Sequence, residues 1–316
     1  MSTAITAKPR SINNAMIIMV SAMLFAPIMD AIAKFGANEF GISPATITLG
    51  RFTVQSLFLG CFVTFVVIKG SKGFGFSWIN VLRGMIMGLA ALLFFTAVKY
   101  MPLADAISVF FVEPLIVMLL SSMFLGETVG WRRRLAALIG FGGALIVIQP
   151  SYELFGLVSL LPLCTAFLFS VYLILTRMSG SSDDPIAMQF YAGIGGVLIC
   201  GTIVSLGSWL GSENFALTIP ESSRGWAMLL SMGLLATASH MLIVIAFSMA
   251  PASILAPFQY VEIVSATILG WFIFGDFPGP MKWVGILIII GSGAYIFWRE
   301  QQIEKDDHAA PVGARS

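Results

Sequence analysis

Charge is scarce in this chain. Only 10% of its 316 residues are Asp, Glu, Lys or Arg, whereas 58% are hydrophobic. A soluble globular protein carries about 25% charged residues, so most of this chain is unsuited to contact with water. The formal net charge of +1 gives no attraction to nucleic acid, and we expect no nucleic-acid partner. The composition indicates a membrane protein.

Sequence motifs of enzymes and pumps are also absent. The chain has no His-Glu-x-x-His, no Gly-x-Ser-x-Gly and no Walker Gly-x-x-x-x-Gly-Lys pattern. Its cysteines, Cys61, Cys164 and Cys200, stand alone in hydrophobic runs without the spacing of metal ligands. We expect them to be buried thiols. The sequence therefore predicts no enzymatic activity, no metal site, no cofactor and no ATP-driven pumping by this chain alone.

Long hydrophobic runs fill most of the chain. A helix needs about 20 mostly apolar residues to cross roughly 30 Å of hydrocarbon. Ten candidate spans meet this criterion, at about 12–35, 44–68, 78–100, 103–125, 132–149, 156–177, 185–207, 225–250, 252–274 and 281–298. The glycines of Gly84-x-x-x-Gly88 and Gly193–Gly196 predict close helix packing. The sequence predicts an all-α polytopic membrane protein with ten transmembrane helices, and polar, disordered tails at 1–11 and 299–316.

An internal repeat divides the spans into two sets of five. Residues 97–148 and 246–297 match at a constant offset of 149 without a gap. The matched pairs include Pro102 and Pro251, Glu113 and Glu262, Gly126 and Gly275, and Glu127 and Asp276. We therefore expect two repeats, at 12–149 and 156–298. Because each repeat has an odd number of spans, the second enters the membrane from the opposite side, as in the inverted repeats of many secondary transporters.

The distribution of Lys and Arg predicts the orientation, because cytoplasmic loops are enriched in both. With the N-terminus inside, eleven basic residues fall on the cytoplasmic side and four on the other. We expect a multi-pass protein of the cell inner membrane with both termini in the cytoplasm. Arg51 and Arg83 belong to neither set because they lie within spans. Arg83 is about a turn and a half from the end of its span, so we expect its side chain to extend to the interface.

Two acidic residues lie at equal depth in the repeats. Glu113 is about eleven residues into the fourth span, roughly 16 Å and close to the midplane, and Glu262 has the same place in the ninth. Together they could bind a cation, a proton or a donor-rich substrate in one cavity. Alternatively, each carboxylate holds neighbouring helices together. Pro114 predicts a kink beside Glu113, and Ile263 at the matching position predicts that the second repeat has none.

Four further ionisable residues are candidates for substrate or proton binding. Asp30 follows Pro27 by three residues, which suggests a distorted stretch facing a cavity. Asp105 lies in the first turn of the fourth span, where a structural capping role is favoured. Arg51 is placed to pair with either aspartate, or to bind a substrate carboxylate or phosphate. His240 lies in the middle of the eighth span and could relay protons, bind substrate or serve packing alone.

Aromatic side chains crowd the same spans and would suit a planar heteroaromatic cargo. They are Phe94, Phe95, Tyr100, Phe110, Phe111, Tyr172, Tyr191, Phe258 and Tyr260. Gln259 and Tyr260 add a polar edge beside Glu262. Glu127 and Asp276 follow glycines in short turns, and we expect them to cap the next helix rather than contact cargo.

These residues resemble a known family. The pattern AVKYMPLADAISVFFVEPLIVMLLSSMFLGE, followed by a basic turn and GFGGALIVI, and the second copy ending in FIFGD are similar to the drug/metabolite transporter superfamily, EamA type. The resemblance covers about residues 15–298. It implies inverted five-helix repeats, with helices 5 and 10 at the periphery and helices 1, 3, 4, 6, 8 and 9 around a central cavity. Members export amino acids and other metabolites, or import compounds such as riboflavin and S-adenosylmethionine.

The sequence thus predicts a secondary transporter that moves a small organic metabolite by alternating access. The resemblance favours uptake of a vitamin- or cofactor-like compound such as riboflavin or S-adenosylmethionine. Export of amino acids or related metabolites is the alternative, and a channel or a membrane scaffold or sensor is the alternative from another class. The expected partners are the substrate and the lipid bilayer, and a homodimer is possible. The sequence does not fix the cargo, the direction or the coupling ion.

Overall fold

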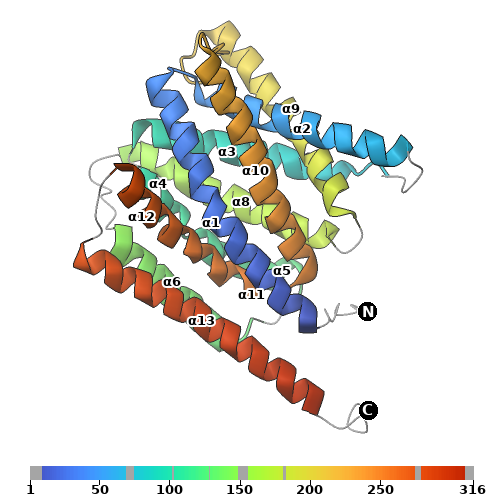
Figure 1. The fold of residues 1–316 in the computed structure, drawn as a ribbon, viewed down its shortest axis with the longest axis vertical. Coiled ribbons are helices and arrows are strands. Elements are labelled where there is room, and N and C mark those ends of the chain that lie inside the picture. The colour runs from blue at the N-terminus through green and yellow to red at the C-terminus, as the bar shows by residue number, and fades with distance from the viewer. Residues whose placement is uncertain are drawn as a thin grey trace.

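The computed structural model describes residues 9–68, 75–101, 103–127, 129–148, 156–180, 183–274 and 279–309. Within these ranges every regular element is a helix (Figure 1). The long hydrophobic runs account for this, because a helix satisfies its backbone hydrogen bonds within one segment and therefore tolerates lipid. Counting described residues only, six helices are long and apolar enough to cross a membrane by length and composition.

The first half contains α1 (Pro9–Glu39), α2 (Pro44–Ile68), α3 (Trp78–Tyr100), α4 (Leu103–Phe110), α5 (Glu113–Phe124) and α6 (Trp131–Ile148). The second half contains η1 (Gly156–Ser159), α8 (Leu160–Ser179), α9 (Pro185–Leu210), α10 (Ser223–Met249), α11 (Ala252–Leu255), η2 (Ala256–Tyr260), α12 (Val261–Phe274) and α13 (Pro280–Ala309). These elements confirm the ten predicted helical segments, two of which are interrupted. The polar residues after 298 depart from expectation, because α13 continues through them to Ala309.

The two interrupted segments occupy matching places in the halves. The fourth segment breaks between Phe110 and Glu113, so Glu113 begins α5 instead of lying inside one continuous helix. The ninth breaks into α11, η2 and α12, with Glu262 in the first turn of α12. The prediction that the second repeat lacks such a break was wrong. Pro257, within η2, has no N–H to continue the helical ladder and does there what Pro114 does at the start of α5.

The packing of the helices follows the repeat. Helix α3 of the first half packs along α8 of the second half. The equivalent helices, α10 of the second half and α1 of the first, pack against each other in the same way. Helix α2 packs against α9, its counterpart in the second half. Helices α6 and α13, also counterparts, pair with each other at one side of the bundle (Figure 1). This confirms the peripheral position expected for the fifth and tenth segments.

Glycines permit the close contact between α3 and α9. A Cβ atom at Gly84 would overlap the carbonyl of Ala192, and one at Gly195 would overlap the carbonyl of Val81. The backbones of the two helices therefore touch directly, which confirms the close packing predicted from the glycine spacing. Such contacts stabilise helices in lipid, where the hydrophobic effect does not drive one helix against another.

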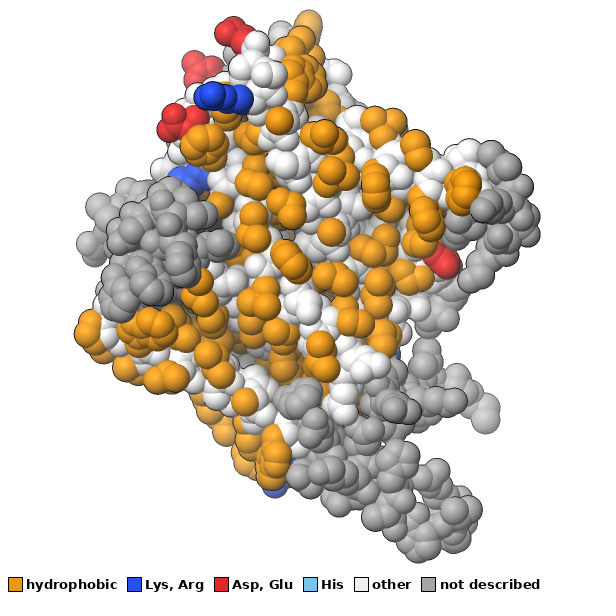
Figure 2. Space-filling model, viewed as in Figure 1, with side chains coloured by type: hydrophobic (Ala, Val, Ile, Leu, Met, Phe, Trp, Pro, Cys, Tyr) orange, Lys and Arg blue, Asp and Glu red, His pale blue; other side chains and the backbone are white. Residues whose placement is uncertain are grey.

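The surface is rich in apolar side chains. Figure 2 shows hydrophobic side chains spread over the visible face, with most of its charged groups gathered at one corner. Many large hydrophobic residues are exposed, among them Phe58, Trp209 and Leu287. Cys61 and Cys164 are exposed as well, so the expectation that all three thiols are buried holds only for Cys200. A surface of this kind fits a bilayer rather than water.

One acidic turn links the two halves. The Glu127 carboxylate accepts hydrogen bonds from the backbone N–H groups of Ala252, at 3.1 Å, and Ser253, at 3.0 Å. It also lies 3.7 Å from Nε of Arg177 at the end of α8. Glu127 therefore caps α11 in the other half, and the expectation that it caps the next helix in sequence was wrong. The matching Asp276 lies outside the described residues.

Candidate functional site

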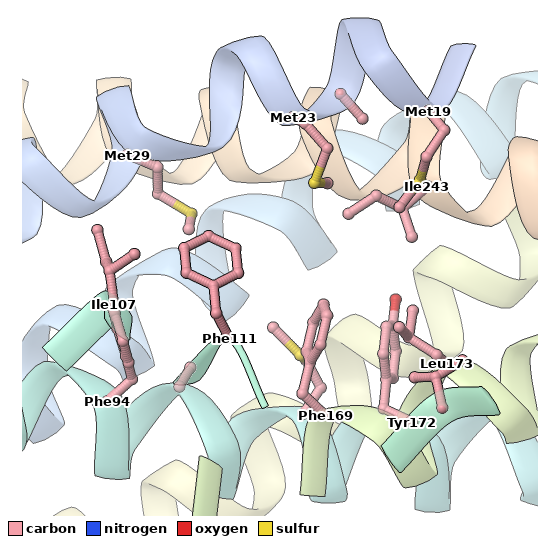
Figure 3. Packing of buried hydrophobic residues seen from close by; sticks show 14 of the residues in the cluster. Met19, Met23, Met29, Phe94, Ile107, Phe111, Phe169, Tyr172, Leu173 and Ile243 are labelled. Atoms are coloured by element: carbon pink, nitrogen blue, oxygen red, sulfur yellow. The ribbon is translucent and has the colours of Figure 1, made fainter. Parts of the chain in front are cut away.

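A cavity of about 70 Å³ lies where the two halves meet. The polar residues that line it are Asp30, Arg51, Thr165, His240, Gln259 and Glu262. The apolar walls include Phe94, Phe95, Phe110 and Phe169 together with Met23, Met29 and Met87. In Figure 3 the methionines of α1 face Phe94, Phe111 and Phe169 from the opposite side.

The cavity draws on the helices that the resemblance implied. Its lining comes from α1, α3 and α4 of the first half, and from α8, α10 and the η2–α12 segment of the second. Arg51 of α2 is an addition that the resemblance did not imply. Most polar candidates predicted from sequence are thus brought together, although they are separated by more than 200 positions in the chain.

Arg51 and His240 form one polar pair on the cavity wall. An Nη2 atom of Arg51 lies 3.0 Å from Nε2 of His240, whose Nδ1 lies 3.0 Å from the carbonyl of Ala236. A carbonyl only accepts, so Nδ1 is assigned the proton and Nε2 accepts from Arg51. The guanidinium also lies 4.9 Å from the centre of the Phe52 ring. These contacts orient Arg51 toward the cavity.

Of the two predicted ion pairs of Arg51, the one with Asp30 is not formed, and the one with Asp105 lies outside the described side chains. Within the described part of the chain, no carboxylate oxygen lies within 4.0 Å of its guanidinium, and its Nε has no hydrogen-bond partner. Arg51 is only 1% exposed. A buried guanidinium without an acid partner keeps donors for another anionic or acceptor group.

Asp30 and Glu262 place carboxyl groups on the same cavity from opposite halves. Asp30 is 5% exposed on α1, and Glu262 is 9% exposed on α12. The hydroxyl of Ser265 donates to the carbonyl of Met23 at 3.1 Å and so holds α12 against α1. Neither carboxyl has a cation within 4.0 Å among the described residues. The two carboxyl groups can therefore bind a cation, take up a proton, or accept hydrogen bonds from a cargo with N–H groups.

Glu113 and Tyr260 lie behind the cavity wall. Oε1 of Glu113 accepts a hydrogen bond from Nε2 of Gln259 at 3.2 Å, while its Oε2 and the hydroxyl of Tyr260 have no hydrogen-bond partner in the described part of the chain. Both residues are fully buried. Of the two matched acids, only Glu262 reaches the cavity directly, and Glu113 reaches it through Gln259. Asp105 lies in α4, but its side chain is outside the described part of the structure.

Arg83 does not extend to the membrane interface, contrary to expectation. It is 0% exposed, and its guanidinium donates to Thr176 Oγ1 at 3.1 Å, to the carbonyl of Met188 at 2.8 Å and to Gln189 Oε1 at 3.2 Å. It also lies over the ring of Tyr172. Arg83 therefore joins α3, α8 and α9 below the cavity. The polar residues Thr176 and Gln189 in otherwise apolar spans were the sequence signal for such a partner.

Phe169 is the main cavity residue that sequence reasoning missed. Its ring lies 5.6 Å from those of Phe110 and Tyr172 and 6.3 Å from that of His240. It therefore connects the aromatic wall with the polar pair. Phe169 precedes Tyr172 by three residues, which puts both on one face of α8. That spacing alone does not separate a cavity wall from ordinary packing.

Comparison with known proteins agrees with this arrangement. The model of the EamA-like transporter family matches twice, at residues 13–149 and 156–298. A riboflavin transporter of Vibrio cholerae is 26% identical over 92% of this chain and 96% of its own length. An S-adenosylmethionine uptake transporter of Rickettsia conorii is 27% identical over 88% of this chain and 90% of its own.

Two further comparisons concern direction and fold. A pseudopaline exporter of Pseudomonas aeruginosa is 26% identical over 66% of this chain and 70% of its own length. One solved crystal structure superposes with a TM-score of 0.73 at 19% identity, over 92% of this chain and 99% of that one. The family match covers both halves and nearly the whole chain. This chain is a multi-pass membrane protein of the EamA-like transporter family.

Proposed function

We propose that this transporter carries a small organic metabolite through the cavity by alternating access between the two sides of the inner membrane. The observation that carries the proposal is the shared cavity, because each half contributes a carboxyl group, Asp30 from the first and Glu262 from the second. A site at the junction of two repeats can be exposed to either side by tilting one half against the other.

The walls of the cavity support uptake of a vitamin- or cofactor-like compound. Phe94, Phe110 and Phe169 offer ring faces, which suit a planar heteroaromatic group. Arg51 supplies donors, and the carboxyl groups supply acceptors for the polar edge of such a ring. Relatives that span almost the whole chain are a riboflavin transporter and an S-adenosylmethionine uptake transporter. Riboflavin is our first candidate and S-adenosylmethionine our second.

Export is the second candidate function, and one relative favours it. The pseudopaline exporter matches two thirds of this chain at the same identity as the riboflavin transporter. A cavity with Arg51 on one wall and two carboxyl groups on another would also hold an amino-acid-like cargo with charges of both signs.

We further propose that both termini are cytoplasmic. The start of α1 and the end of α13 lie toward the same end of the bundle in Figure 1, which supports an even number of spans.

A growth experiment separates uptake from export. The gene would be expressed in a riboflavin auxotroph that lacks its own carrier, on medium with limiting riboflavin. Uptake predicts restored growth by the wild-type chain, and loss of that growth in Glu262→Gln at equal protein level. The variant Glu221→Gln, changed at an exposed acid in the loop before α10, serves as the control and should grow like wild type. Equal growth with and without the wild-type chain would speak against uptake, and so would slower growth when the chain is expressed.

A further inference from the structure

The segment 252–260 is unlike every other helical stretch around the cavity. It contains one turn of α-helix, α11, followed by the 3₁₀ turn η2 with Pro257, and all nine of its residues are buried. Gln259, near its end, lines the cavity. A short segment broken from its neighbours can shift without disturbing a long ladder of backbone hydrogen bonds. If the protein is a transporter as proposed, such a segment is a natural moving part.

The N-terminal end of this segment is held by contacts with charged side chains. Glu127 accepts from the N–H groups of Ala252 and Ser253, and Arg177 lies beside the same carboxylate. Nη1 of Arg177 in turn donates to the carbonyls of Phe247, at 3.0 Å, and Ser248, at 3.2 Å. The ends of α5, α8 and α10 and the start of α11 therefore meet at one point. Hydrogen bonds to ionised groups are the stronger kind in proteins.

The C-terminal end of the segment is held by a second carboxyl group, that of Glu113 at the start of α5. Nε2 of Gln259 donates to Glu113, and the ring of Tyr260 lies 5.8 Å from that of Phe111. Glu113 begins α5, and Glu127 lies just after its end. Helix α5 thus holds the segment 252–260 at both ends, with one acid for each.

The segment runs from the Glu127 contact to the cavity wall. Thr165 and Phe169 line the cavity twelve and eight residues before Arg177 on α8, which is roughly 18 and 12 Å along the helix axis. Between them and the Glu127 end lie fully buried apolar side chains, including Met19 and Leu173, which face each other in Figure 3. This layer seals the cavity toward that end.

One pair of equivalent positions is buried differently in the two halves. Phe110 corresponds to Gln259 by the repeat offset, and it lines the cavity while only partly buried. Gln259 is 3% exposed. The two halves thus differ at this pair of equivalent positions.

We propose that residues 252–260 form the gate that closes the cavity toward the Glu127 end, and that Glu113 becomes accessible from that end when the gate opens. In the closed state Glu113 Oε2 and the Tyr260 hydroxyl are buried without hydrogen-bond partners among the residues that the structure describes. Opening would let water reach both groups, which removes a cost of the closed state. The clamp at Glu127 offsets that cost and keeps the gate shut.

The test measures access to the gate in the full-length chain, reconstituted in permeable vesicles with the three native cysteines replaced. Ser253→Cys is the reporter, because the Ser253 hydroxyl is buried and has no hydrogen-bond partner to lose. We expect slow modification by a water-soluble maleimide in the otherwise unchanged chain. Adding Glu127→Ala should raise the rate at least about tenfold, since it removes charge-assisted bonds from the segment. Glu127→Gln keeps the size of the side chain and one acceptor, so it should give an intermediate rate. The control Glu221→Ala should leave the rate unchanged.

A second reporter distinguishes gating from local loosening. Ala91→Cys lies on the cavity wall, and its modification should slow when Glu127→Ala opens the gate, because the opposite side then closes. An unchanged rate at Ser253→Cys would overturn the proposal, and so would a rise there without a fall at Ala91→Cys. The labelling needs no cargo. Failure to transport the tested metabolites would therefore count against the proposed function and leave this result standing.

Discussion

At the scale of single residues, the partners of a buried charge separate the groups that line the cavity from those that hold helices together. Asp30, Arg51 and Glu262 line the cavity without an ion-pair partner within 4.0 Å among the described residues. Arg83 instead donates hydrogen bonds to Thr176, Met188 and Gln189. The sequence predicted that Arg83 extends to the membrane interface. Its true partners could not be predicted, because they are about 90 or more positions away in the chain.

The Arg83 network gives the residue-scale prediction. Replacing Arg83 by Gln leaves Thr176 and the Met188 carbonyl without their donor, and we expect a loss of about 2–4 kcal/mol of folding free energy. The thermal unfolding midpoint of the detergent-solubilised protein should fall. Cargo affinity of the folded fraction should stay the same, because Arg83 does not line the cavity. Arg224→Gln, at an exposed site at the start of α10, provides the control. Equal midpoints for the two variants would refute the structural role.

At the scale of helices, hydropathy and glycine spacing predicted much of the structure. The span positions followed from apolar runs of the required length, and the Gly84 and Gly195 contacts followed from the glycine pattern. The break in the ninth segment was missed, because the comparison with Pro114 was made at Ile263 and not at Pro257. Likewise, the partner of Glu127 is 125 positions away, so no local capping pattern could reveal it.

The α3–α9 contact gives the prediction at the scale of helices. In Gly195→Ala the new methyl group overlaps the Val81 carbonyl, so the helices must separate. Such overpacking typically costs about 1–3 kcal/mol. We expect a clear drop in the thermal midpoint. Gly201→Ala, in the same helix, places its methyl group in open space and is the matched control. If both variants unfold at the same temperature, close packing of these helices is not what stabilises the bundle.

At the scale of the whole molecule, the duplicated chain explains the cavity. Two five-helix halves share the α2–α9 and α6–α13 contacts, and the cavity receives polar groups from both. The sequence repeat was sufficient to predict this architecture. It could not predict the difference between the halves, because the two copies have similar sequences. A single conformation of an inverted repeat, in contrast, closes the cavity toward one side of the membrane only. The structure supplies that difference at Phe110 and Gln259.

The most direct test of the account is uptake by purified protein in proteoliposomes. Labelled riboflavin and labelled S-adenosylmethionine would be offered separately, with and without a pH gradient, to the wild type, Glu262→Gln and Glu221→Gln at equal protein content. The account predicts wild-type uptake of one of the two compounds, at least about tenfold slower uptake by Glu262→Gln, and unchanged uptake by Glu221→Gln. Wild-type uptake that is unaffected by Glu262→Gln would contradict the claim that the cargo passes through the cavity between the halves.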